Sequence, residues 1–223
     1  MIAERLAEVR ARIERAARAA GRDPATVRLV AVSKTKPAEA VREAYAAGQR
    51  DFGENYAQEL ADKSVALADL TELRWHFIGH LQSNKARVVA PIATLVHTVD
   101  SPSLAAELGK RAASRGRPLD VLVEVNVSGE AQKSGARPAD LPALLDAIAA
   151  LPALGVRGLM TMPPHDLDAA RRAFEALVAL RDDNGGAARL PELSIGMSDD
   201  LEIAIATGAT IVRVGSAIFG ARG

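Results

Sequence analysis

The chain has 223 residues, a formal net charge of zero and no cysteine. A chain of this length can bury one sizeable core and is short for two full domains. Zero net charge gives no field that favours nucleic acid or a membrane surface, and the lack of cysteine excludes disulfides, thiolate metal sites and cysteine nucleophiles. The first residues soon carry charges, without the apolar core of a signal peptide, and no stretch is apolar enough to span a bilayer. We therefore expect a single domain over residues 1–223 of a cytoplasmic protein.

Apolar residues at helical spacing predict an amino-terminal helix over about residues 2–20, which Gly21 ends. Short apolar runs then alternate with helical patterns. The predicted strands are 28–33, 50–52, 75–78, 95–99, 121–127, 156–160, 193–195 and 211–214, and the predicted helices are 38–47, 55–68, 83–89, 103–115, 139–151, 167–182 and 199–207. This alternation indicates an α/β fold, and eight strands suggest a TIM-like (β/α)₈ barrel, with a doubly wound open sheet as the alternative. The amino-terminal helix would be an addition that packs on the barrel or plugs its bottom.

Lys34 ends the first predicted strand, where a short apolar run stops abruptly in an amine. The carboxyl end of a buried parallel strand points to the place where α/β folds keep their active sites. A partly desolvated amine there can lose its proton and form a Schiff base with an aldehyde. The ordinary alternative is a solvated strand end.

The loops after the last two predicted strands have the features of a phosphate site. Gly215 and Ser216 follow the eighth strand, before a short apolar segment that could form one helical turn, and Ser198 follows the seventh strand. In barrels these two loops commonly hold a phosphate through backbone N–H groups and a helix dipole. Two ordinary capped turns are the alternative, with Ser198 capping the next helix. We expect Asp199 and Asp200 to stabilise that helix start rather than to face a phosphate.

Arg213 shares side-chain parity with Ile211, so both residues should face the barrel interior. An arginine there needs an acceptor, which could be Glu124, Asp100 or a ligand. Beside a pyridine nitrogen, an arginine that stays charged would keep the nitrogen unprotonated and weaken the ring as an electron sink.

Asn55, after the second strand, could cap its helix or contact a ligand, and Glu54 could be a first-turn acid or a ligand contact. His76 and His80 are four residues apart but are separated by a turn at Gly79, so we expect no metal site. The chain also lacks the glycine-rich motif of P-loop and Rossmann sites and the nucleophile elbow of α/β-hydrolases.

Seven segments together resemble the pyridoxal phosphate homeostasis protein family, and the resemblance runs over nearly the whole chain. They are VSKTKP (32–37), FGENY (52–56), WHFIG (75–79), LQSNK (81–85), GLM (158–160), GMSDD (196–200) and RVGSAIFG (213–220). The family is similar to the barrel domain of alanine racemase. One departure is His80, where relatives often have a proline or another residue, and it affects no proposed cofactor contact.

The resemblance implies a single-domain barrel that holds pyridoxal 5′-phosphate (PLP) in its mouth. Lys34 falls on the family's Schiff-base lysine, Arg213 on the arginine near the pyridine nitrogen, and Asn55 on a residue that lines the pocket. The phosphate-binding positions correspond to Met197, Ser198, Gly215 and Ser216. The resemblance implies no metal and no catalytic residue.

The function implied is that of an intracellular PLP carrier or buffer without a turnover reaction of its own. We expect a monomer that contacts apo PLP-dependent enzymes transiently and binds neither nucleic acid nor membranes. The alternative is a PLP-dependent amino-acid racemase, which needs two acid/base groups. Lys34 can be one, but Tyr45 and Tyr56 fall in predicted helices, and an end at Gly223 leaves no room for the second domain that supplies the tyrosine of alanine racemase. A third possibility is a barrel enzyme with a lysine Schiff base and a sugar phosphate.

Overall fold

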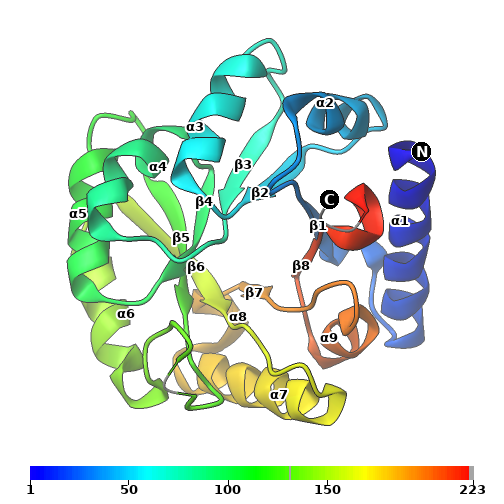
Figure 1. The fold of residues 1–223 in the computed structure, drawn as a ribbon. Helices are drawn as coiled ribbons and strands as arrows, with labels where there is room; N and C mark the ends of the chain where they lie inside the picture. The colour runs from blue at the N-terminus through cyan, green and yellow to red at the C-terminus, as the bar shows by residue number, and fades with distance from the viewer. Residues whose placement is uncertain (131, 221–223) are drawn as a thin grey trace.

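The computed structural model describes residues 1–130 and 132–220, and eight parallel strands form a closed barrel within them (Figure 1). Each strand pairs with its neighbours in chain order, and β8 closes on β1 with Arg28 opposite Ile211 and Ala31 opposite Val214. The predicted barrel is confirmed, and the open-sheet alternative is wrong. The strands are β1 (Arg28–Val32), β2 (Asp51–Glu54), β3 (Arg74–Phe77), β4 (Leu95–Val99), β5 (Leu119–Glu124), β6 (Leu154–Met160), β7 (Glu192–Ser194) and β8 (Ile211–Val214).

Helices surround the barrel and follow the strands in the order that the sequence predicts. They are α2 (Ala38–Ala46), α3 (Ala57–Ala66), α4 (Ala86–Ile92), α5 (Pro102–Ala112), α6 (Leu141–Ala149), α7 (Leu167–Asp183), α8 (Gly186–Arg189), α9 (Leu201–Thr207) and α10 (Ser216–Phe219), with 3₁₀ turns η1 (Pro24–Thr26), η2 (Ser83–Lys85) and η3 (Pro138–Asp140). The predicted helix 83–89 is therefore a 3₁₀ turn followed by α4, and α8 was not predicted.

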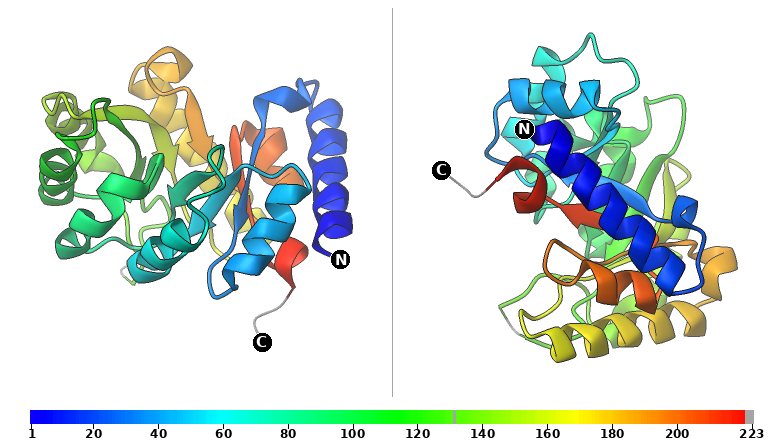
Figure 2. Two further views of the ribbon diagram at one scale, coloured as in Figure 1. Left: turned by 90° about the horizontal axis from the view of Figure 1, so that it is seen from above. Right: turned by 90° about the vertical axis from the view of Figure 1, so that its right-hand side faces the viewer.

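The amino-terminal helix α1 (Ile2–Ala19) packs on the outside of the barrel, against α2, α9 and α10 (Figure 2). Its buried face consists of Leu6, Val9, Ile13 and Ala17. Among the described residues, β8 is followed by the single turn α10, and the much longer α1 packs beside it on the outside of the barrel. Of the two predicted placements, packing on the barrel is the one observed.

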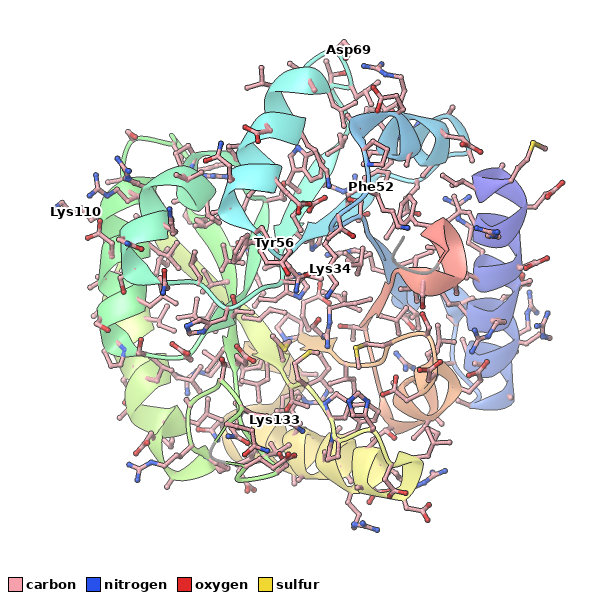
Figure 3. The ribbon with its side chains drawn as sticks, viewed as in Figure 1. Lys34, Phe52, Tyr56, Asp69, Lys110 and Lys133 are labelled. Carbon is pink, nitrogen blue, oxygen red and sulfur yellow. The ribbon has the colours of Figure 1, made fainter. Side chains whose placement is uncertain are left out.

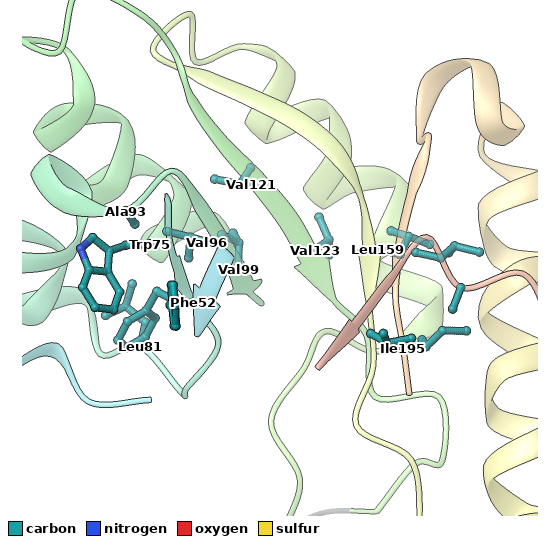
Figure 4. Close-up of a cluster of buried hydrophobic side chains, with 14 of the residues drawn as sticks. Phe52, Trp75, Leu81, Ala93, Val96, Val99, Val121, Val123, Leu159 and Ile195 are labelled. Carbon is teal, nitrogen blue, oxygen red and sulfur yellow. The ribbon is translucent and has the colours of Figure 1, made fainter. Parts of the chain in front are cut away.

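The main apolar core lies between the barrel and the helices, where outward-facing strand residues such as Phe52, Trp75 and Val121 are buried (Figure 4). The barrel interior holds a smaller apolar cluster of Val30, Leu95, Leu122, Met160 and Ile211. TIM-barrel interiors are usually filled by branched apolar side chains.

This barrel is unusual because its buried polar side chains include two histidines and an arginine, described below. Among the described helices, none is both long and apolar enough to cross a membrane.

Candidate functional site

A cavity of about 320 Å³ lies at the carboxyl ends of the strands, and all seven residues predicted to hold a ligand line it. They are Lys34, Asn55, Met197, Ser198, Arg213, Gly215 and Ser216; the other lining residues are Val32, Thr35, Lys36, Ile78, Met162, His165, Asp199, Phe219 and Gly220. Figure 3 shows Lys34 near the middle of the ring of helices. Residues that are 182 positions apart in the chain, such as Lys34 and Ser216, therefore share one site.

The segment that carries Lys34 is fixed on both sides by hydrogen bonds to neighbouring elements. Before it, the carbonyl oxygen of buried Ser33 accepts from Lys63 Nζ at 2.7 Å. After it, the backbone N–H of Thr35 donates to Glu59 Oε2 at 2.8 Å. Thr35 has a φ of 61°, a left-handed conformation that is uncommon for residues with a branched β-carbon. The contacts with α3 stabilise this turn, and Lys34 is thereby held at the cavity.

Glu54 is the centre of the network that fixes the Lys34 segment. It is the last residue of β2 and is fully buried, and its Oε1 accepts from Ser33 Oγ and from Lys63 Nζ, both at 2.7 Å. Burial raises the pKa of Glu54, and the hydrogen bonds from Lys63 and Ser33 oppose that rise. The prediction that Glu54 is a first-turn helix acid is wrong, because α3 begins three residues later. Sequence reasoning missed Lys63 and Glu59, whose only signal is their i, i+4 spacing on α3.

Arg213 projects from β8 into the barrel interior, as its parity predicted, and only 3% of its surface is exposed. It donates to Ser194 O at 2.6 Å, to Ser194 Oγ at 2.7 Å and to Thr161 O at 3.2 Å. These oxygens take the place of the carboxylate acceptors that the sequence suggested. Burial lowers the pKa of Arg213 to about 10, opposed by the charges of Glu124 and Asp200, so the guanidinium stays protonated at neutral pH.

Glu124, at the end of β5, is also buried inside the barrel, and its Oε2 has no hydrogen-bond partner among the described residues. Burial raises its pKa to about 7, with a further rise from the charge of Asp100 and an opposing effect from Arg213. Glu124 therefore faces the barrel interior and influences Arg213 electrostatically, but it is not the hydrogen-bond acceptor of Arg213 that the sequence suggested as one possibility.

The two carboxyl-terminal loops bring their hydroxyl groups together. Ser198 Oγ and Ser216 Oγ lie 3.3 Å apart on the cavity wall. Asp200, and not Ser198, occupies the N-cap position of α9, and its Oδ1 accepts from the backbone N–H of Met197 at 2.5 Å. The capping role predicted for Ser198 is therefore wrong. Asp199 lines the cavity, contrary to the expectation that it would only stabilise the helix start.

Asn55, after β2, also lines the cavity and does not cap α3, whose N-cap position is Tyr56. Its Oδ1 is buried without a hydrogen-bond partner among the described residues. The loop after β3 passes so close that a β-carbon on Gly79 would lie 2.1 Å from the carbonyl oxygen of Asn55. Only glycine permits this approach.

His76, in the segment WHFIG, and His80, just after that segment, do not form a metal pair. His76 is buried in the barrel, whereas His80 is exposed and bonded to Ser134 Oγ at 3.2 Å. The described residues contain no cluster of three or more histidine, cysteine or acidic residues suited to a metal ion. His165, which lines the cavity, was not singled out from the sequence because it lies in a loop outside every recognised segment.

The closed barrel with a lysine just after β1 agrees with the alanine racemase barrel class that the sequence resemblance implied. Residues 5–223 match the family described as "Alanine racemase, N-terminal domain". The chain is 57% identical to the pyridoxal phosphate homeostasis protein of Pseudomonas aeruginosa, over 99% of this chain and 96% of that protein. It is 47% identical to the protein of the same name from Escherichia coli, over 99% and 97%.

A solved structure of PipY from Synechococcus elongatus with PLP bound matches with a TM-score of 0.82 and 41% identity, covering 99% of this chain and 100% of that chain. The chain therefore belongs to the pyridoxal phosphate homeostasis protein family, and the resemblance noted in its sequence is confirmed.

Proposed function

We propose that this protein binds PLP in the cavity at the carboxyl ends of the strands and serves intracellular PLP homeostasis as a carrier or buffer. PLP supplies an aldehyde that can condense with a lysine amine. The observation that carries the proposal is the convergence of the seven sequence-predicted residues on one cavity. The PLP-bound structure of PipY, a relative over its full length, supports it.

The residues present fit a phosphorylated pyridine with an aldehyde. Lys34 supplies the amine, and the paired hydroxyl groups of Ser198 and Ser216 supply neutral donors for a phosphate. The first turn of α10 adds backbone N–H groups that lack intrahelical acceptors. Asn55 Oδ1, which has no hydrogen-bond partner among the described residues, adds an acceptor at the cavity. Asp199 also lines the cavity, and its charge disfavours an anion there. The pKa of Arg12 is raised chiefly by its hydrogen bond to Glu202, with a smaller contribution from the charge of Asp199, so Arg12 offsets Asp199 only in part.

Arg213 determines what a bound pyridine ring can do. Because the guanidinium only donates hydrogen bonds and stays charged, a ring nitrogen beside it remains unprotonated. An unprotonated ring stabilises a carbanion poorly, which disfavours amino-acid chemistry. We therefore propose that the protein binds PLP without a turnover reaction.

The racemase alternative requires a second acid/base group opposite Lys34. His165, Lys36 and Asp199 line the cavity and are the titratable side chains from which such a group would have to come. The test is to incubate PLP-loaded protein with L-alanine and other L-amino acids and to follow the D-isomers by chiral chromatography. We expect only a trace, equal in the Lys34→Ala protein. Turnover near 1 s⁻¹, the low end of ordinary enzyme rates of roughly 1–10³ s⁻¹, would establish the racemase instead.

The binding proposal is tested by reducing the PLP-loaded protein with borohydride and mapping the labelled peptide. We expect the pyridoxyl group on Lys34, with labelling lost in Lys34→Ala and retained in the matched control Lys36→Ala. Reproducible labelling of Lys36 in the parent protein would contradict the assignment. Transfer of PLP from loaded protein to apo PLP-dependent enzymes tests the carrier role, and light scattering tests the proposed monomer.

A further inference from the structure

A continuous chain of hydrogen bonds crosses the barrel interior from the cavity at the carboxyl ends of the strands toward the opposite end. Starting at Arg213, it runs to Ser194 Oγ (2.7 Å), from Ser194 Oγ to His97 Nδ1 (2.8 Å), from His97 Nε2 to His76 Nδ1 (2.9 Å) and from His76 Nε2 to Asp51 Oδ1 (2.9 Å). These residues come from β8, β7, β4, β3 and β2 in turn. We call them the interior chain.

The interior chain ends at a second, separate cavity. Asp51 is the first residue of β2, and its two oxygens accept from Arg74 at 2.9 and 2.6 Å. Asp51 and Arg74 line a cavity of about 430 Å³ at the amino ends of the strands. Arg213 lines the cavity at the carboxyl ends. The interior chain therefore joins the two ends of the barrel through groups that are shielded from water.

The two ends of the interior chain determine the direction of every hydrogen bond in it. Burial opposes ionisation of Asp51, but hydrogen bonds from Arg74 and His76 outweigh it and lower its pKa. An ionised carboxylate only accepts, so His76 Nε2 carries a hydrogen and donates to it. Burial lowers the pKa of His76 and holds that of His97 well below its usual value, so both rings are neutral.

Neutrality then fixes the remaining links. A neutral His76 that donates from Nε2 must accept at Nδ1, so His97 donates from its own Nε2. His97 in turn accepts at Nδ1 from the hydroxyl of Ser194. The hydroxyl oxygen of Ser194 is left to accept from Arg213, which can only donate. Each hydrogen bond of the interior chain then pairs one donor with one acceptor.

We propose that Ser194, His97 and His76 are positioning residues that hold the Arg213 guanidinium in one orientation at the cavity, with Asp51 setting the direction of the chain from the opposite end of the barrel. The effect of this positioning on PLP rests on the proposed function, whereas the direction of the hydrogen bonds does not. A buried arginine without fixed acceptors would be costly and free to turn. Here Ser194 accepts from it twice, and His97 fixes the hydroxyl of Ser194.

The direction of the hydrogen bonds in the interior chain can be measured on the protein without PLP. In ¹⁵N-histidine-labelled protein, the ring nitrogens of His76 and His97 report their tautomers by NMR, with assignment by His76→Gln and His97→Gln. We expect both rings to be neutral with the hydrogen on Nε2 at pH 7. In Asp51→Asn, whose amide can accept or donate, we expect the Nδ1–H tautomer to appear in part. An imidazolium or a dominant Nδ1–H tautomer in the parent at pH 7 would overturn the proposal.

The effect on the cavity is tested with Ser194→Ala, which removes one hydroxyl. Thr207→Val is the matched control, because the half-buried Thr207 hydroxyl donates to Ile203 O at 2.8 Å near the end of α9 and lies outside both the interior chain and the cavity wall. We expect Ser194→Ala to weaken PLP binding about fivefold and to shift the absorbance maximum of bound PLP. The control should not shift that maximum, and Ser194→Thr, which keeps a hydroxyl, should restore the parent spectrum.

The two arms separate the possible failures. An unchanged affinity and spectrum in a folded Ser194→Ala protein would overturn the positioning role, even if the tautomers are as expected. If PLP does not label Lys34 in the parent, the proposed function fails, while the tautomer measurement still decides whether the interior chain has the stated direction. Should Ser194→Ala not fold, the absorbance spectra of PLP-loaded Asp51→Asn and Ser194→Thr provide the cavity test. If Asp51→Asn has both the absorbance spectrum and the histidine tautomers of the parent, the proposal is overturned.

Discussion

Replacing Glu124 by glutamine should make the stability of the protein less dependent on pH. Glu124 is 5% exposed, and its pKa is raised from 4.5 to about 7 by burial and by the charge of Asp100. A carboxyl group whose pKa is raised by folding stabilises the fold fully below its ordinary pKa, and this contribution is lost as the pH rises through the folded value. The parent should therefore lose stability between about pH 4.5 and somewhat above pH 7.

The size of this loss follows from the pKa change. A rise from 4.5 to about 7 corresponds to roughly 3 kcal/mol at pH 8, and interior relaxation makes about 1–3 kcal/mol the expected range. Since Glu124 Oε2 has no hydrogen-bond partner within residues 1–130 and 132–220, the amide of Glu124→Gln gives up little and avoids the buried charge. Urea unfolding of the protein without PLP at pH 5 and pH 8 measures the effect.

We expect Glu124→Gln to exceed the parent in stability at pH 8 and to match it closely at pH 5. The control is Glu175→Gln, a change at an exposed position of α7. A variant that is less stable than the parent at pH 8 would refute the reasoning, because it would show that the ionised carboxylate is stabilised in the fold.

Two further predictions concern the walls of the cavity. Gly215→Val should reduce PLP affinity by at least about tenfold, roughly 1.4 kcal/mol, in a binding titration, because a β-carbon there already meets Val32 O at 3.2 Å; parent-like affinity would place the phosphate elsewhere. Lys63→Met should cost about 3–5 kcal/mol in urea unfolding, because it leaves Glu54 buried without its cation. The double variant Lys63→Met/Glu54→Gln should recover much of that loss, and a cost below about 1 kcal/mol in the single variant would contradict the role of the ion pair.

Much of the fold followed from the sequence because the strands are short apolar runs separated by helical patterns. The ranges 95–99 and 211–214 match β4 and β8, and the remaining strand boundaries differ by a few residues. Seven of the cavity residues were also found: Arg213 faces inward from the last strand, and the other six follow strands whose carboxyl ends meet at one end of the barrel.

The side-chain network across the barrel was not found, because its central link joins β4 and β7, which are not neighbouring strands in the chain. His97 and Ser194 are 97 residues apart, and nothing local to either indicates a shared hydrogen bond. Alternation along a strand tells which side chains face inward, but not which of them meet. Asn55 does not cap α3 because the helix begins one residue later than a cap at Asn55 requires, and a one-residue shift at a helix end is beyond what the sequence resolves.

The two halves of the cavity are held by different networks, and this leads to a last prediction. Lys63 fixes the end of β1 through Ser33 and Glu54, whereas Ser194 fixes Arg213 on β8, and the hydrogen bonds around Lys63 and Ser194 share no partner. Groups without shared partners usually contribute additively, within about 0.5 kcal/mol. The free energies of unfolding of Lys63→Met, Ser194→Ala and the double variant complete a double-mutant cycle. We expect a coupling energy below about 0.5 kcal/mol. A coupling above about 1 kcal/mol would mean that the paired strands β1 and β8 transmit strain between the lysine segment and Arg213, so that the cavity would respond as one unit.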